Sequence, residues 1–329
     1  GGRNIGEEYF EINQDTKFDD YEVLAIGRIV EDVQAGFDEF WNSELSVPME
    51  AFKVETDPAK LEEWREVIRQ TVSAQREGMY ATALNSQLFQ DLDSGKRKPS
   101  VAPASLFTDA PSKLQADIGD REEAVLAVEL GRRFRAAKKE ILIITPYYIP
   151  QKAGAEMIEE LLAKGIRVII VTNSLASTNH VAVHSGYARY RKRLLQAGAE
   201  FYEVRADAVH DENQWGHTPE AVTLHSKATI IDRETIFIGS LNFDPRSIFI
   251  NTEMGLFIES GENGKTFTEG VIAELSRITW RVDLDDKGKL RWTYMNGDQP
   301  EVVNKEPQAS WWRRFQVVFY GLLPIESQL

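Results

Sequence analysis

From residue 120 onward, apolar segments that resemble strands alternate with amphipathic helical segments, and this order constrains the fold more than any other feature. The segments 140–149, 166–174 and 199–205 are rich in β-branched and aromatic residues, as strands are. Such strands are typical of a sheet that helices cover on both faces. The sequence therefore predicts an α/β fold with a mixed, mostly parallel sheet. The helical segments are 121–137, 155–165 and 186–198, and further strands are expected at 222–232, 235–239 and 251–259.

The first third of the chain is expected to hold a strand over 22–30 and two helices, over 31–43 and 57–75. The second helix has a strong start signal, because Asp57 can cap it and Pro58 fits its first turn. Both helices carry aromatic and aliphatic side chains on one face, and we expect these faces to pack into a core.

Residues 91–115 are polar and contain three prolines, which is typical of a domain junction or a crossing segment. The basic triplet 96–98 in this stretch is either a solvated loop or a contact with anionic head groups. We expect four parts along the chain: residues 1–100, a junction at 101–119, a second domain at 120–309 and an amphipathic C-terminal segment at 310–329.

The composition is that of a globular protein, with 42% apolar and 27% charged residues in 329. The formal net charge of −14 disfavours nucleic acid as a partner, because polyphosphate binding needs many Lys and Arg side chains. The chain has no cysteine, so disulfides and thiolate chemistry are excluded. No apolar run reaches the ~18 residues of a membrane-spanning helix.

The stretch "LHSKATIID" (224–232) places a base, a cation and an acid in an apolar segment. His225 and Lys227 are two residues apart, so on a strand they would project from one face, and Asp232 ends the strand. "GSLNFDPRS" follows, in which Gly239 and Ser240 permit close backbone approach and Asn242 offers amide donors. Such a set suits phosphoryl oxygens. Glu253, on the next strand, could hold the second ring nitrogen of the histidine.

The spacing His-x-Lys-x4-Asp-x6-Gly-Ser-x-Asn resembles the HKD signature of the phospholipase D superfamily. "PYYIP", "HSGYARYRKRLLQAGAEFYE", "GSLNFDPRSIFINTEMGL" and "LLPIESQL" are similar to the bacterial cardiolipin synthase C type of that superfamily. These stretches span most of 140–329. The resemblance implies a phospholipase D-like fold of two pseudo-repeat domains, the first of them truncated here.

The opening "GGRNIGEEYF" resembles the segment that follows the first HKD motif in members with two motifs. Gly1, Gly2 and Asn4 match Gly239, Ser240 and Asn242 in spacing. Residues 18–27 then resemble the strand that supplies the partner carboxylate, from either Asp20 or Glu22. The resemblance implies that the first triad precedes Gly1 and that this chain alone is inactive.

The resemblance also implies phosphatidyl transfer through a phosphohistidine, without metal or cofactor. His225 would be the general acid and base, while Lys227, Ser240, Asn242 and Asn4 hold phosphate oxygens and Glu253 serves as a site carboxylate. Asp232 would order its strand. The expected partners are phosphatidylglycerol, with phosphatidylethanolamine as another donor, at the surface of a bacterial membrane, to which the protein would bind peripherally. The alternatives are a phospholipase, a phosphodiesterase or nuclease completed by a homodimer, and a non-catalytic lipid-binding protein.

Several residues outside this set have two interpretations. His184 and Tyr187 could contact a head group or only pack at a helix start, and Arg246 could orient a phosphate or stabilise its loop. The other histidines, His180, His210 and His217, lack a lysine at the required spacing. The C-terminal segment 310–329, with two Trp, two Phe and a Tyr around Arg313 and Arg314, is either an interfacial helix or the last core helix.

Overall fold

The computed structural model describes residues 1–9, 16–52, 57–74, 87–96, 98–117, 123–208, 221–296 and 299–329. His210, His217 and Arg97 lie outside these ranges. The described chain forms two compact units, one made of residues 1–43 and 103–329 and the other of residues 44–102. The smaller unit contains η2 (Met49–Ala51), α2 (Pro58–Ala74) and α4 (Gln87–Asp93).

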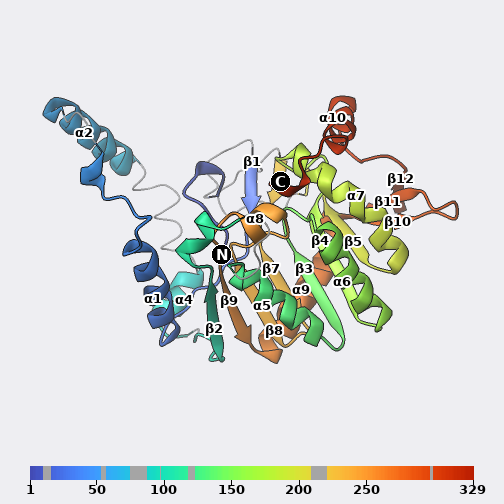
Figure 1. Cartoon of the computed structure of the whole chain (residues 1–329), viewed down its shortest axis with the longest axis horizontal. Helices are drawn as coiled ribbons and strands as arrows, with labels where there is room; N and C mark the ends of the chain where they lie inside the picture. The colour runs from blue at the N-terminus through green and yellow to red at the C-terminus, as the bar shows by residue number, and fades with distance from the viewer. Residues whose placement is uncertain are drawn as a thin grey trace. The chain divides into compact units, whose positions relative to one another are not determined.

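A ten-stranded mixed sheet forms the centre of the larger unit (Figure 1), in the order β12-β11-β10-β5-β4-β3-β7-β8-β9-β2. Only the neighbours β3–β4 and β4–β5 are parallel among its pairs, and the remaining pairs are antiparallel. The α/β class and the mixed sheet are confirmed, although antiparallel pairs outnumber parallel ones. The strands are β2 (Ala104–Thr108), β3 (Glu140–Ile144), β4 (Arg167–Asn173), β5 (Glu200–Val204), β7 (Ala228–Ile231), β8 (Thr235–Gly239), β9 (Met254–Glu259), β10 (Thr279–Leu284), β11 (Leu290–Asn296) and β12 (Gln299–Val303).

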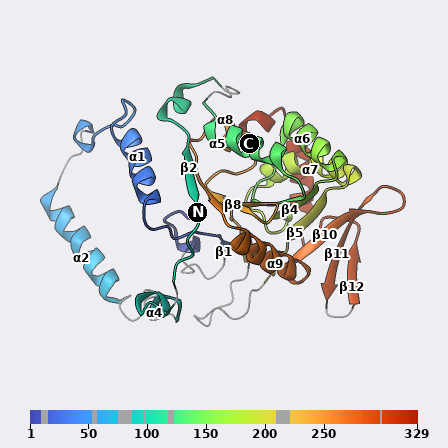
Figure 2. The ribbon, with the colours of Figure 1, turned by 90° about the horizontal axis from the view of Figure 1, so that it is seen from below.

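Helices cover the sheet on both faces, which explains why its central strands are apolar throughout. Figure 2 shows α5, α6 and α7 on one side of the strands and α9 on the other. In β3, Ile141 and Ile143 pack with the first three helices, whereas Leu142 and Ile144 pack in the cluster that α9 joins. The helices are α5 (Val125–Ala136), α6 (Gln151–Ala163), α7 (Val181–Ala197), α8 (Pro245–Phe249), α9 (Gly261–Ile278) and α10 (Trp311–Gly321).

The N-terminal segment contributes directly to the larger unit. Its strand β1 (Thr16–Asp19) pairs in parallel with β6 (Ala221–Leu224), immediately before His225. β2, which lies inside the predicted junction 101–119, forms an edge of the large sheet by pairing with β9. Residues that look like a linker in sequence therefore take part in the sheet that carries the site.

The predicted strand over 22–30 is wrong. No ladder forms there, and α1 (Ile29–Trp41) begins before the predicted strand ends. The alternation is nevertheless real: Tyr21 and Val23 pack against the α9 side of the core, while Leu24 and Ile26 are exposed. An extended segment with one buried face needs a neighbouring strand to become part of a sheet, and this segment has none in the described structure.

Both early helices form close to their predicted bounds, as α1 and α2, but their apolar faces do not reach a core. Phe37 and Trp41 of α1 are exposed, as are Trp64 and Ile68 of α2. The core prediction for these faces is therefore wrong in the described structure. Among the described residues, no helix is both long enough and apolar enough to cross a bilayer.

Candidate active site

His225 and Lys227 lie in the short link between β6 and β7, at one end of the sheet. Both are buried, and Lys227 Nζ lies 3.0 Å from each ring nitrogen of His225. The link is held in place from the N-terminal side, because the His225 amide donates to the Asp19 carbonyl over 2.8 Å. The base and the cation are thus brought together as their spacing predicts, though in a link between two strands rather than within one.

The carboxylate that faces His225 belongs to Asp20. Its Oδ2 atom lies 2.8 Å from His225 Nδ1. Glu22, the alternative in the sequence, instead forms an ion pair with Arg3 Nε at 2.9 Å. The Asp20 contact leaves Nε2 as the ring nitrogen available for proton transfer.

The N-terminal segment also closes over the histidine ring. Tyr9 Oη lies 3.4 Å from His225 Nε2, and the Asn4 amide donates to Tyr9 Oη over 3.0 Å. Phe18 stacks on the imidazole with ring centroids 5.4 Å apart. A Cβ atom at Gly2 would lie 2.7 Å from Lys227 Cδ, so a side chain at this position would displace the end of the Lys227 side chain.

Glu253 is positioned differently from its sequence prediction. Its carboxylate accepts a hydrogen bond from the Ser240 hydroxyl, and Ser240 Oγ accepts one from the Met254 amide over 3.0 Å. It therefore lines the site from the β8–β9 side, while Asp20 takes the contact with the imidazole.

Asp109 and Lys113 form a buried ion pair that fixes the backbone at Glu253. The sequence analysis did not identify either residue. Lys113 Nζ lies 2.6 Å from Asp109 Oδ2 and 3.1 Å from the Ser247 carbonyl, and both side chains are fully buried. Asp109 also accepts from the amides of Glu253 and Leu126, over 3.1 and 3.0 Å. The i, i+4 spacing of the pair was visible in sequence, but its burial was hidden by the polar stretch around it.

Asp232 lies at the far end of β7 from His225, where it orders the backbone. Its carboxylate accepts hydrogen bonds from the amides of residues 138, 139 and 140, over 2.8, 2.7 and 3.0 Å. It thereby fixes the start of β3 against the end of β7.

Burial dominates the electrostatics of the site. It lowers the pKa of Lys227 to about 8, although the charges of Asp20, Glu253 and Asp244 act to raise it. Burial also raises the pKa of Asp244 to about 7 and raises that of Glu253. Lys227 lies among the carboxyl groups of Asp20, Asp244 and Glu253, so an entering phosphate would compete with them for this cation.

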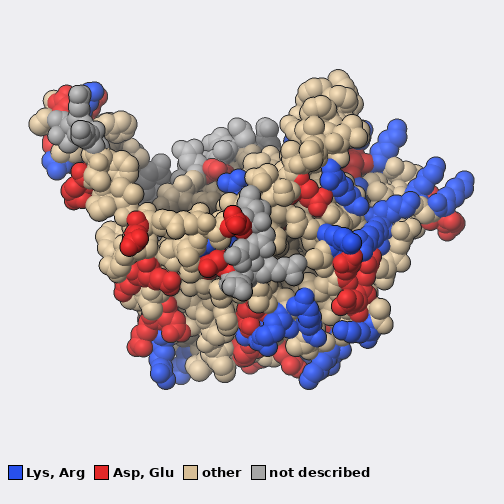
Figure 3. Space-filling model, in the orientation of Figure 1, with Lys and Arg blue, Asp and Glu red and all other residues tan. Residues whose placement is uncertain are grey.

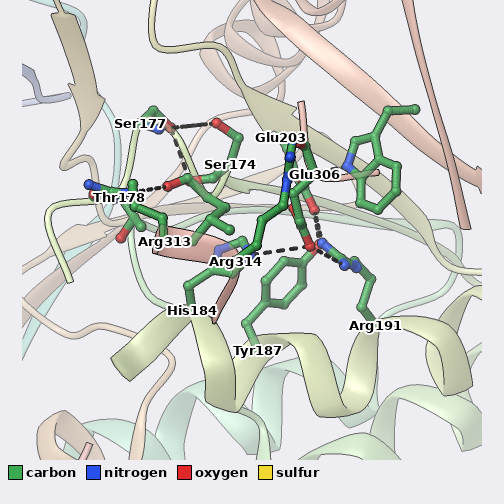
Figure 4. Close-up of polar contacts among 12 residues, drawn as sticks. Ser174, Ser177, Thr178, His184, Tyr187, Arg191, Glu203, Glu306, Arg313 and Arg314 are labelled. Atoms are coloured by element: carbon green, nitrogen blue, oxygen red, sulfur yellow. Dashed lines mark hydrogen bonds and ion pairs between the residues drawn. The ribbon is translucent and has the colours of Figure 1, made fainter. Parts of the chain in front are cut away.

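Of the remaining residues that the sequence singles out, some lie at the site and others lie elsewhere in the fold. Asn242 is half-buried, and its Oδ1 atom has no hydrogen-bond partner among the described residues. The Arg246 side chain is exposed, and its amide donates to the Leu329 carbonyl over 2.9 Å. Tyr187 donates to Glu203 over 2.9 Å, and His184 Nε2 lies 3.7 Å from Glu306 (Figure 4). Tyr187 and His184 thus belong to a buried polar network that joins α7 to Glu203 and Glu306.

The fold and the paired His225 and Lys227 define a phospholipase D-like domain, and comparison with known proteins agrees. The family described as "Cardiolipin synthase, PLD-like domain" matches residues 130–278. Cardiolipin synthase C of Escherichia coli is 32% identical over 99% of this chain and 69% of its own length. The chain belongs to the cardiolipin synthase family of the phospholipase D superfamily, whose members are phosphatidyltransferases and phosphodiesterases.

Two more distant proteins are also similar to this chain. An uncharacterized protein of Helicobacter pylori is 28% identical over 79% of this chain, which spans only 51% of that relative. The crystal structure of a phosphatidylserine synthase from Haemophilus influenzae is 14% identical, covering 70% of this chain and 49% of its own, with a TM-score of 0.44.

Proposed function

We propose that this chain carries one half of the active site of a cardiolipin synthase-like phosphatidyltransferase. The observation that carries the proposal is the buried set of His225, Lys227 and Asp20, in which a carboxylate holds one ring nitrogen and an ammonium lies at the ring. The donor is phosphatidylglycerol or phosphatidylethanolamine, and the acceptor is a glycerol hydroxyl of a second phosphatidylglycerol.

The proposed reaction has two steps. In the first, an imidazole outside this chain's motif attacks phosphorus, the bond to the leaving alcohol breaks, and His225 Nε2 donates a proton to that alcohol. In the second, His225 removes a proton from the incoming hydroxyl, whose oxygen attacks phosphorus, and the bond between phosphorus and the first imidazole breaks. Asp20 keeps the ring in the required orientation throughout.

Polar groups around His225 would stabilise the charge that develops on the phosphoryl oxygens. Lys227 supplies a positive charge, and Asn242, Ser240 and Asn4 supply hydrogen-bond donors. Ser240 and Asn4 donate to Glu253 and Tyr9 here, so substrate would exchange these contacts for its own. Asn242 would donate through its Nδ2 amide, because its Oδ1 atom, which has no partner among the described residues, can only accept.

The proposed reaction needs a second histidine, the nucleophile, in addition to His225. His-x-Lys-x4-Asp occurs once in these 329 residues. We propose that residues 1–100 belong to a first phospholipase D-like domain, 101–119 to a junction and 120–309 to the second, and that the first domain supplies the other histidine. The pairing of β1 with β6 supports this proposal, because it joins the first segment to the catalytic link. A homodimer that pairs two copies of His225 is the alternative, and the match of Gly1, Gly2 and Asn4 to Gly239, Ser240 and Asn242 in spacing weighs against it.

The substrates would be bilayer lipids, so we propose that the protein works in peripheral association with the bacterial cell membrane. The C-terminal segment 310–329 would take part in this association. Its helix has eleven residues, which suits a position within the interface rather than across the bilayer.

A transfer assay tests the proposal. Full-length protein is incubated with phosphatidylglycerol vesicles, and cardiolipin is measured by mass spectrometry. His225→Ala should lower the rate by a factor of ~10²–10⁴, the usual contribution of a general acid and base. His180→Gln, at an exposed histidine, is the matched control and should keep the wild-type rate. Unchanged cardiolipin formation by His225→Ala would refute the role of His225. Phosphatidic acid without cardiolipin would show a phospholipase instead.

A further inference from the structure

Helix α10 presents an apolar face that the larger unit leaves uncovered. None of its residues is buried, and it stands out beside α7 (Figure 1). Trp311, Phe315, Val318 and Leu322 follow one another at intervals of three and four residues, so they line one face. Trp311, Val318 and Leu322 are 73%, 65% and 80% exposed. Trp312 and Phe319 widen the same face.

The aromatic rings on this face are arranged before any partner arrives. Trp312 stacks on Phe315 with centroids 5.4 Å apart, and Trp311 meets Trp312 edge to face at 5.6 Å. Amphipathic aromatic rings favour the zone between lipid head groups and acyl chains. Because stacking already restricts these side chains, little rotamer freedom would be lost on insertion.

The two arginines of α10 point inward and hold the helix to the protein (Figure 4). Arg313 donates to the carbonyls of Leu175 and Thr178, and Arg314 donates to the Glu306 carbonyl over 2.7 Å. Burial lowers the pKa of Arg313, as expected for a guanidinium turned away from solvent. These cations are therefore engaged with backbone oxygens and do not face outward toward lipid phosphates.

The loop whose carbonyls accept hydrogen bonds from Arg313 is itself hydrogen-bonded to the end of β6, next to His225. In this loop Ser177 donates to Asn173 Oδ1 over 3.1 Å. The Asn173 side chain in turn exchanges two hydrogen bonds with the backbone of Leu224, over 2.8 and 2.9 Å. Leu224 directly precedes His225. α10 is thus connected to His225 through hydrogen bonds and the short backbone segments between them.

We propose that the apolar face of α10 docks on the phospholipid bilayer by hydrophobic insertion rather than by attraction to anionic head groups. The proposal rests on the proposed lipid substrate. The distribution of charged residues favours the bilayer as the partner of the α10 face. The helix carries no acidic residue in a chain of net charge −14, and on the face shown in Figure 3 it is nearly free of charged side chains. An apolar surface without acidic side chains would meet an anionic membrane with little direct repulsion.

The proposal predicts how the binding of the chain to vesicles depends on ionic strength. Attraction between a basic patch and lipid weakens as salt screens it, whereas insertion of apolar rings does not. Cosedimentation of the chain with phosphatidylcholine vesicles should therefore persist from about 0.05 to 0.5 M KCl, beyond which a Debye length is only a few ångströms. With phosphatidylglycerol vesicles, added salt should leave binding unchanged or strengthen it, because it screens the repulsion from the net negative charge.

Substitutions on the face provide the decisive comparison. Trp311→Ser with Phe315→Ser should weaken vesicle partitioning at least about tenfold for each ring removed. Met295→Ser with Val302→Ser is the matched control, because it removes two exposed apolar side chains from β11 and β12. The control should bind like wild type. Circular dichroism and thermal unfolding should be unchanged in both variants, since all four side chains are exposed.

Three outcomes would overturn the proposal. Vesicle binding that is lost at high salt would mean that electrostatic attraction drives it, and equal binding by both variants would mean that another surface docks. The third outcome is that the wild type is an oligomer that does not bind vesicles, while the α10 variant is a monomer. This would mean that the α10 face contacts a second copy of the chain instead of the bilayer. Binding is measured without turnover, so it can succeed or fail independently of cardiolipin formation and of His225.

Discussion

The carboxylate of Asp20 controls which nitrogen of His225 can transfer a proton, and its removal is a prediction at the scale of one residue. Asp20→Asn keeps the shape of the side chain but replaces a charged acceptor on Nδ1 by a neutral amide. We expect the transfer rate of the full-length protein to fall by a factor of ~10²–10⁴, with a smaller change in KM, because an unsuitable tautomer impairs proton transfer more than binding. Glu22→Gln is the matched control, since Glu22 pairs with Arg3, and it should retain the wild-type rate. The reverse ranking of the two variants would give the role to Glu22.

Sequence reasoning reaches these residues unevenly, for physical reasons. The spacing of His225, Lys227 and Asn242 is local, so it could be read directly from the chain. The choice between Asp20 and Glu22 is not local: each stands near the same strand, and only the approach of the N-terminal segment to the β6–β7 link decides which carboxylate faces the imidazole. Asp109 and Lys113 look like any polar pair until the fold encloses them.

At the scale of elements, the segment from β2 through η3 (Pro111–Gln115) fixes the backbone at Glu253, just before β9, through the buried pair of Asp109 and Lys113. Lys113→Met should destabilise the protein by about 3–5 kcal/mol, because it leaves Asp109 buried without its cation. Asp109→Asn combined with Lys113→Met removes both charges and should recover part of that loss. Urea unfolding monitored by circular dichroism measures both values. If the double variant is less stable than Lys113→Met, the ion pair itself is not what stabilises this segment.

The elements show the same division between local and non-local information. Helix α2 begins where Pro58 predicts, and the apolar strands of the central sheet form, because capping and hydrophobic periodicity act within a few residues. The strand over 22–30 fails because pairing requires a neighbour that no local pattern specifies. Likewise, an amphipathic face shows that a helix needs a covering partner, but not what that partner is, as the exposed faces of α1 and α10 illustrate.

At the scale of the whole molecule, the site lowers the stability of the fold near neutral pH. Asp244 holds its proton to about pH 7 when folded, against 3.8 for a free side chain, so between these values stability falls as pH rises. Lys227 acts in the opposite sense: its pKa is about 8 when folded and 10.5 when free, so stability rises with pH between these values. The combined contribution of these two buried groups is therefore least favourable at pH 7–8, and at pH 7 a phosphate would find the lysine still largely charged.

This opposition predicts two difference curves. The unfolding free energy of wild type minus that of Asp244→Asn should fall by an amount on the order of 2–4 kcal/mol from pH 4 to pH 7. Asparagine can still cap α8, so the cap contributes little to the difference. The same difference for Lys227→Met should rise by about 2–3 kcal/mol from pH 8 to pH 10.5, the range in which only the unfolded lysine keeps its proton. Chemical denaturation at each pH gives both curves, and subtraction cancels the titration of groups that all three proteins share. Difference curves that stay flat in these windows would mean that the two side chains titrate as they do in water, and that the fold does not bear the cost of burying them.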